Sequence, residues 1–304
     1  MSNIDLSVNI AGVNLKNPIT TASGTFSVEE SSQFYDLSEL GAMITKGVAA
    51  RPWNGNATPR IAETYGGMLN SVGLQNPGVE EYIKHDLELA KKFDTKVIAN
   101  IAGHSIPEYC EVIERLNEED AVHMYEVNIS CPNVKEGGIG FGTQPEMAAK
   151  VTSEVKKISK KPVIIKLTPN VTDITEIAKA VEAAGADGVS LINTLLGMKI
   201  DVHRRKTVLA NKMGGFSGPA IMPVAVRMVY QVRRSVNIPI IGLGGITTGE
   251  DVVEFLMAGA DAVSIGTAVF SDPCAPVRIK NELVDFMEKY GFETLGDISE
   301  AFLG

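Results

Sequence analysis

The strongest constraint on the fold of this chain is a repeated alternation between short apolar runs and longer amphipathic stretches. Such alternation is typical of consecutive strand–helix units, whose strands form a parallel sheet. Most of the predicted strands are mainly apolar, as strands buried on both faces are. The predicted strands cover residues 18–22, 42–45, 96–101, 125–129, 162–167, 188–192, 238–243 and 262–265. The predicted helices cover residues 28–40, 78–93, 107–117, 145–159, 173–184, 219–235, 249–258 and 276–290.

Eight such units predict an α/β fold of the (β/α)8 TIM-barrel type. The 304 residues are close to the roughly 250 that are usual for this fold, so we expect residues 1–304 to form a single domain. Residues 6–10 and 13–15 flank Ala11 and Gly12, which predicts an N-terminal β-hairpin that closes the bottom of the barrel. The βα loops after strands two and six, residues 46–77 and 193–218, are unusually long. Loops of this kind build the sites of barrel enzymes.

Charge and hydropathy narrow the function. The chain has 37 acidic and 28 basic residues, a formal net charge of -9, which is the wrong sign for binding nucleic acid. The N-terminus lacks the basic stretch followed by an apolar run that is typical of a secretory signal. No window approaches the roughly 18 apolar residues that a membrane span needs. Three cysteines are too few for a disulfide framework. We therefore expect a cytoplasmic protein that binds neither nucleic acid nor membrane.

Polar residues occur at the carboxyl ends of the predicted strands, which meet at one rim of a barrel. Asparagine offers both a donor and an acceptor, and lysine stabilises negative charge, so this rim suits a polar heterocycle. The rim residues at strands one to six are Ser23, Gly24, Lys46, Gly47, Asn100, Asn128, Cys131, Lys166, Asn193 and Thr194.

Glycines follow strands seven and eight, as Gly244-Gly245 and Gly266-Thr267. Paired glycine turns at these two strands favour a phosphate site built from backbone N–H groups, although each alone is also consistent with a tight turn. Lys46 and Lys166 lie in apolar surroundings, where an unpaired ammonium is costly. Each is expected to meet an anionic or electron-rich group, the alternative being a solvated strand end.

Cys131 follows strand four and precedes Pro132, which favours an ordered loop that presents the thiol to a ligand. The alternative is an inert packed cysteine, which is the preferred interpretation of Cys110 and Cys274. The four histidines lack metal-ligand spacing, so we predict no metal site. No P-loop and no nucleophile elbow is present.

Four motifs carry a family resemblance. They are Asn-Ile-Ser-Cys-Pro-Asn at 128–133, Asn-Ser-Val-Gly-Leu-Gln-Asn-Pro-Gly at 70–78, Thr-Lys-Gly at 45–47 and Ile-Gly-Leu-Gly-Gly-Ile at 241–246. Together they resemble the dihydroorotate dehydrogenases, over essentially the whole chain. Residues 193–197 and 214–220 look most like the catalytic subunit of class 1B. A cysteine in place of serine as the base separates class 1 from the quinone-linked class 2.

The resemblance implies one FMN per subunit and assigns contacts to it. FMN would be contacted by Ser23, Lys46, Gly47, Asn100, Asn128, Lys166, Ile192, Gly218, Gly244, Gly245, Gly266 and Thr267. The substrate would be held by Lys46, Asn70, Ser71, Val72, Gly73, Leu74, Asn128, Asn133, Asn193 and Thr194.

The resemblance also implies a reaction, the oxidation of (S)-dihydroorotate to orotate in pyrimidine biosynthesis. Cys131 would take the C5 proton while hydride leaves C6 for flavin N5, and Lys46 or Lys166 would stabilise charge on the flavin. The implied assembly is a homodimer joined to two electron-transfer subunits as a heterotetramer. These partners would carry FAD and a [2Fe-2S] cluster and reduce NAD.

Three other functions remain open from sequence. The first is a fumarate-linked dihydroorotate oxidase of class 1A. The second is an aldolase-type lyase in which Lys166 forms a Schiff base. The third is an FMN enzyme acting on uridine in transfer RNA, which the acidic charge disfavours.

Overall fold

The computed structural model describes residues 4–130, 135–136 and 139–304. Within these residues, eight strands form a closed barrel. Each strand pairs in parallel with the next one along the chain, and the last strand pairs with the first. The predicted (β/α)8 fold is therefore confirmed. The barrel strands are β3 (Ile19–Thr21), β4 (Ala42–Ile44), β7 (Lys96–Ile101), β8 (Met124–Asn128), β11 (Val163–Lys166), β12 (Gly188–Leu191), β17 (Ile240–Leu243) and β18 (Ala262–Ile265).

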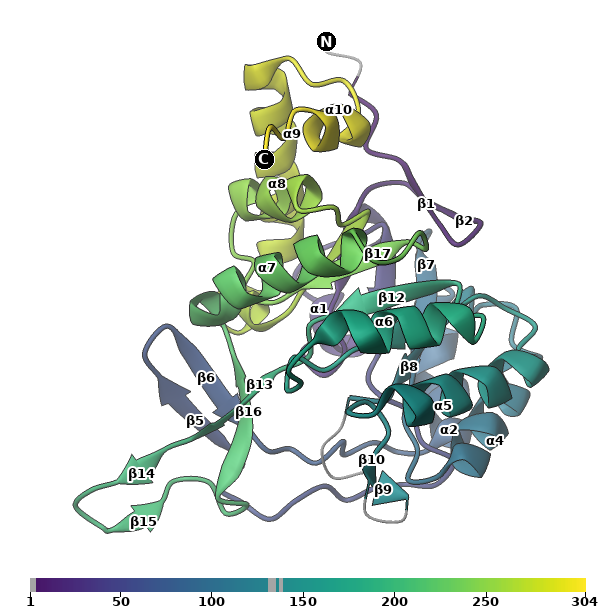
Figure 1. The fold of residues 1–304 in the computed structure, drawn as a ribbon, viewed down its shortest axis with the longest axis vertical. Coiled ribbons are helices and arrows are strands. Elements are labelled where there is room, and N and C mark those ends of the chain that lie inside the picture. The colour runs from purple at the N-terminus through teal and green to yellow at the C-terminus, as the bar shows by residue number, and fades with distance from the viewer. Residues whose placement is uncertain (1–3, 131–134, 137–138) are drawn as a thin grey trace.

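The outer helices cover the barrel in the order of the chain (Figure 1). In the described part of the chain, no helix has the length and apolar character needed to cross a membrane. The long helices are α4 (Ile106–Leu116), α5 (Pro145–Ile158), α6 (Ile174–Ala183), α7 (Met222–Arg233), α8 (Gly249–Met257) and α9 (Ala275–Tyr290). The remaining helical segments are α1 (Val28–Ser31), η1 (Leu37–Glu39), α2 (Val79–Glu81), η2 (Tyr82–Leu87), α3 (Glu88–Ala90), η3 (Pro219–Ile221), η4 (Thr267–Phe270) and α10 (Leu295–Glu300).

The helix predicted over residues 28–40 is wrong in its extent, because the chain forms only the short segments α1 and η1 there. The Ser27 side chain accepts a hydrogen bond from Glu30 N, and the Asp36 side chain accepts one from Ser38 N. Serine and aspartate compete for backbone groups in this way and favour helix ends over helix interiors. The segment is therefore capped twice and is not one continuous helix.

Three other helices differ from the prediction in detail. Residues 82–87, inside the predicted helix 78–93, are a π-helix. The predicted helix 219–235 begins as the 3-10 turn η3, because Pro223 has no N–H to donate to the carbonyl of Pro219. The helix α10 was not predicted, although Thr294 and Asp297 form a capping box at its start.

The predicted hairpin is formed by β1 (Val8–Ile10) and β2 (Val13–Leu15). Ile10 and Leu15 are buried in a cluster with residues from inside the barrel, among them Ala42, Ile98 and Ile164. These three lie at or near the amino ends of their strands. The hairpin therefore closes that end of the barrel, as predicted.

The two long loops fold together into one antiparallel sheet, which sequence reasoning did not predict. The strand order in this sheet is β13-β16-β6-β5. Figure 1 shows it extending from the molecule on the side away from the β1–β2 hairpin. The loop strands are β5 (Ile61–Thr64), β6 (Gly67–Asn70), β13 (Leu195–Met198), β16 (Met213–Ser217), and the short pair β14 (Ile200–Asp201) and β15 (Lys206–Thr207). A further short pair, β9 (Lys135–Glu136) and β10 (Ile139–Gly140), precedes α5.

Candidate functional site

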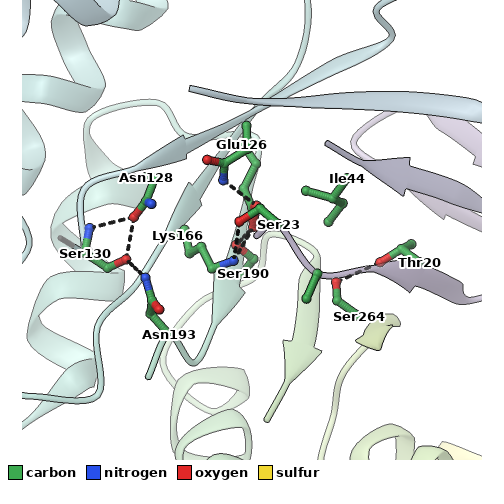
Figure 2. Close-up of polar contacts among 12 residues, drawn as sticks. Thr20, Ser23, Ile44, Glu126, Asn128, Ser130, Lys166, Ser190, Asn193 and Ser264 are labelled. Atoms are coloured by element: carbon green, nitrogen blue, oxygen red, sulfur yellow. Dashed lines mark hydrogen bonds and ion pairs between the residues drawn. The ribbon is translucent and has the colours of Figure 1, made fainter. Parts of the chain in front are cut away.

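Lys166 at the carboxyl end of β11 lies at the centre of a buried polar cluster (Figure 2). Its Nζ is 3.3 Å from Glu126 Oε1, and the two side chains are only 4% and 1% exposed. Its Nζ also donates to Ser23 Oγ at 3.4 Å. The anion expected beside Lys166 is therefore a protein carboxylate on the neighbouring strand β8. This ion pair stabilises the ammonium and gives no support to a Schiff-base lysine, which must react as the free amine.

Asn100 in β7 joins this cluster from the other side of Glu126. Its Nδ2 donates to Glu126 Oε2 at 2.8 Å. Its Oδ1 is buried and has no hydrogen-bond partner within the described residues. A Cβ built on Gly47 would lie 2.9 Å from this Oδ1 and 3.8 Å from Leu74 Cδ2. Asn100, Gly47 and Leu74 are therefore neighbours, and a ligand donor at Asn100 would satisfy a costly buried acceptor.

Asn128 and Asn193 meet through Ser130. Ser130 donates twice to Asn128 Oδ1, from N at 3.2 Å and from Oγ at 2.6 Å. Asn193 Nδ2 donates to Ser130 Oγ, as Figure 2 shows. The backbone before residue 131 is thus fixed to the ends of two strands.

The glycines after β17 form part of the same rim. Gly244 and Gly245 have φ values of +133° and +88°, which favour glycine. A Cβ on Gly245 would lie 2.9 Å from Gly218 O, and one on Gly244 would lie 3.3 Å from Ile192 Cγ1. Four of the predicted cofactor positions, Ile192, Gly218, Gly244 and Gly245, therefore lie close together.

Gly266 and Thr267 follow β18, which is paired with β17. A Cβ on Gly266 would lie 3.6 Å from Ala22 Cβ. Within the described chain, the backbone N–H groups of Gly245, Gly266 and Thr267 donate to no other residue. Such groups can bind an anion such as phosphate.

Lys46 differs from Lys166, because none of the described acidic residues forms an ion pair with it. Burial lowers the pKa of Lys46, and the nearby Arg60 lowers it further. Lys46 lines a pocket of about 320 Å³ together with Gly47, Tyr82 and Asp86. Burial raises the pKa of Asp86. The ammonium at this end of the barrel is therefore destabilised until an anionic or electron-rich group lies beside it.

The two long loops bring Asn70 and Thr194 together around Gly215. Asn70 ends β6 and is paired with Gly215 of β16. The side chain of Thr194 occupies the space that a Cβ on Gly215 would need. The predicted substrate positions from the two loops therefore meet in the structure.

The loop after Asn70 is held by hydrogen bonds. Ser71 N donates to Arg60 O at 2.8 Å, and Asn56 N donates to Val72 O at 3.0 Å. Asn56 also fills the space beside Gly73. The Oγ of Ser71 is buried without a partner among the described residues. The loop is thus fixed while one of its polar atoms remains free for a ligand.

Cys131 and Asn133, predicted as the base and a substrate contact, lie outside the described residues.

Cys110 is half-buried, but the packed role expected for Cys274 is wrong, because that side chain is exposed. Cys274 sits at the N-cap of α9, near the surface, and its Sγ contacts Phe34 O at 3.7 Å. Among the described residues, no group of three His, Cys, Asp or Glu side chains could hold a metal ion.

Comparison with known proteins places this site in a family. Residues 5–287 match the family model described as dihydroorotate dehydrogenase. A curated relative from Alkaliphilus metalliredigens is 60% identical over 98% of this chain and 99% of its own length. The chain belongs to the dihydroorotate dehydrogenase family. The resemblance predicted from the motifs is confirmed.

The relatives also bear on the type of enzyme. The Alkaliphilus protein and one from Oceanobacillus iheyensis are both named dihydroorotate dehydrogenase B (NAD(+)), catalytic subunit. The latter is 58% identical over 98% of each chain. These names match the NAD-linked type that the sequence predicted for this member of the family. A crystal structure from Eimeria tenella, a dihydroorotate dehydrogenase with ferulenol, has a TM-score of 0.78 at 21% identity. It covers 98% of this chain and 88% of its own, which supports the fold.

Glu126, Ser130 and Ser190 are the rim and core residues that sequence reasoning missed. Glu126 is fully buried inside β8 and joins this strand to β7, β11 and β12. The available signal was its position two residues before Asn128, since residues two apart in a strand share a face. An acidic residue on the inner face of an apolar strand needs a buried partner of opposite charge, which here is Lys166.

Proposed function

We propose that this dihydroorotate dehydrogenase oxidises (S)-dihydroorotate to orotate in pyrimidine biosynthesis, with FMN bound at the carboxyl end of its barrel. One observation carries the proposal. In a chain that matches this family over almost its whole length, polar residues from six neighbouring strands converge on one rim with a buried acceptor, Asn100 Oδ1, left unpaired. FMN supplies the redox chemistry when bound, by accepting hydride.

The residues at the rim fit FMN by their chemistry. The N–H groups of Gly245, Gly266 and Thr267 suit a phosphate. The ammonium groups of Lys46 and Lys166 suit the electron-rich ring, and Asn100 offers it an acceptor. The remaining proposed contacts are Ser23, Gly47, Asn128, Ile192, Gly218 and Gly244.

The substrate face of the site is formed by amide side chains and the loop after Asn70. Dihydroorotate is a ureide with a carboxylate, so asparagine edges complement its N–H and C=O groups. Backbone N–H groups of the loop can meet the carboxylate. The proposed contacts are Lys46, Asn70, Ser71, Val72, Gly73, Leu74, Asn128, Asn133, Asn193 and Thr194.

Cys131 is the proposed base that takes the C5 proton. Support comes from the residue before it, because Ser130 is bonded to both Asn128 and Asn193. This anchoring fixes Ser130, the residue before Cys131, at the rim. An ordinary thiol is mostly protonated at neutral pH, so the proposed role requires surroundings that favour the thiolate.

The proposed assembly is a homodimer joined to two iron-sulfur, FAD-carrying subunits. Support comes from the relatives, which are named as catalytic subunits of an NAD-linked enzyme. The partner subunits would take electrons from this chain and reduce NAD.

The decisive test is anaerobic addition of dihydroorotate to the purified yellow protein. The bound flavin should bleach, and NADH should then form only when the partner subunit is added with NAD. Cys131→Ser should retain flavin and slow its reduction by at least roughly 100-fold at neutral pH, which is the usual scale of a lost general base. Near-normal reduction by this variant would exclude Cys131 as the base.

A further inference from the structure

Glu126 is a buried carboxylate with contacts to three other strands. It lies on the inner face of β8 and is fully buried. Its Oε1 accepts from Ser190 Oγ at 2.8 Å and lies 3.3 Å from Lys166 Nζ. Its Oε2 accepts from Asn100 Nδ2 at 2.8 Å. One carboxylate therefore links β7, β8, β11 and β12 at the base of the candidate site.

These contacts decide which atom Asn100 presents. An ionised carboxylate can only accept hydrogen bonds, so the Nδ2 of Asn100 must face Glu126. Its Oδ1 consequently faces Gly47 and remains unpaired within the described residues. Glu126 thus presents an acceptor to the site.

The same carboxylate determines the charge around Lys166. The ion pair fixes the Lys166 ammonium near Ser23 at the rim. The positive and negative charges of the pair sum to zero. Without the carboxylate, the ammonium would be an uncompensated positive charge in a buried place, where charges act over longer distances than in water.

We propose that Glu126 is a positioning residue that holds Lys166 and Asn100 against the cofactor and lowers the reduction potential of the bound flavin. This inference rests on the proposed binding of FMN at this rim. A negative charge beside the cofactor disfavours the addition of electrons, and protein charges near a flavin tune its chemistry in this way.

The test is the reduction potential of the bound flavin, measured by equilibration with redox dyes and without dihydroorotate. Three variants separate charge from packing. Glu126→Gln removes the charge and keeps the shape, Glu126→Asp keeps the charge, and Ser190→Ala removes one hydrogen bond to the same carboxylate. Glu126→Gln should raise the ratio of reduced to oxidised flavin at least tenfold at a fixed dye potential, about 30 mV for a two-electron couple. The other two variants should stay within threefold of the native ratio.

An unchanged potential in Glu126→Gln would overturn the proposal, and so would an equal shift in Ser190→Ala or Glu126→Asp. A folded Glu126→Gln protein that no longer retains flavin would support it, provided that Glu126→Asp retains flavin. Because the measurement uses no substrate, native protein that binds flavin but fails to oxidise dihydroorotate would refute the proposed function and leave this test intact. Native protein that binds no flavin would overturn both proposals.

Discussion

At the amino-terminal end of the barrel, Ile98, Met124 and Ile164 pack against the hairpin residues Ile10 and Leu15. Two residues further along the same three strands, the inner face carries Asn100, Glu126 and Lys166, all buried. A step of two residues returns to the same face of a strand, so one set of strands supplies both layers. The first layer is apolar and packs against the hairpin, whereas the second is polar and lies at the candidate site.

The largest effect should come from breaking the ion pair in the polar layer. Lys166→Met leaves Glu126 as an unpaired buried charge, so the free energy of unfolding without cofactor should fall by about 4 kcal/mol. Urea denaturation of flavin-free protein measures this change.

A double variant provides the control for that loss. Glu126→Gln with Lys166→Met removes both charges, and the glutamine oxygen can still accept from Asn100 Nδ2 while its amide N–H faces Ser190 Oγ. Most of the lost stability should return, while flavin affinity should not. A double variant as unstable as Lys166→Met would mean that packing around the lysine stem, and not the unpaired charge, dominates.

A change in the apolar layer should lower stability without affecting flavin binding. Leu15→Ala opens a cavity under the barrel and should lower the free energy of unfolding by about 3 kcal/mol, while flavin affinity stays unchanged in the folded protein. Val13→Ala, on the same strand but only partly buried, should cost less. Flavin titration of both variants checks the separation, and weakened binding in Leu15→Ala would show that the two layers are coupled.

The smallest effect is expected at Lys46. Burial destabilises its ammonium group, which has no acidic partner in the described chain. Lys46→Met should raise the free energy of unfolding of the flavin-free protein by about 1 kcal/mol and weaken flavin and substrate binding.

The pH dependence of this gain identifies its cause. The pKa of Lys46 is lower in the folded than in the unfolded chain. Between these two pKa values the unfolded chain binds more protons than the folded one, so the stability of the native protein rises with pH there. The advantage of Lys46→Met should be full below the folded pKa and shrink as the pH rises toward the unfolded pKa. Thermal unfolding between neutral and alkaline pH tests this, and a constant advantage would point to packing.

Much of the fold could be predicted because the barrel strands are mainly apolar and alternate with amphipathic stretches. The bounds predicted for residues 96–101 and 262–265 match β7 and β18, and the other barrel strands differ by at most two residues at either end. The helix predicted at 28–40 failed because serine and aspartate side chains cap its segments, a local competition that apolar periodicity does not reveal.

The candidate site was partly predictable for the same reason. Strand ends of a parallel barrel meet at one rim, so Ser23, Lys166, Asn128 and Asn193 could be nominated from position alone. Their actual contacts run through Glu126 and Ser130. These were missed because Glu126 pairs with Asn100, Lys166 and Ser190, and Ser130 with Asn193, all far away in the sequence.

The sequence by itself determined the barrel, the hairpin at its base and the family, because periodicity, strand ends and motifs are local properties of the chain. Only the tertiary structure decided how the two long loops pair into one sheet, which brings Asn70 beside Thr194. It also decided that Lys166 has a carboxylate partner while Lys46 has none among the described residues. Burial and charge pairing depend on which strands become neighbours, and closing the barrel is what sets those neighbours.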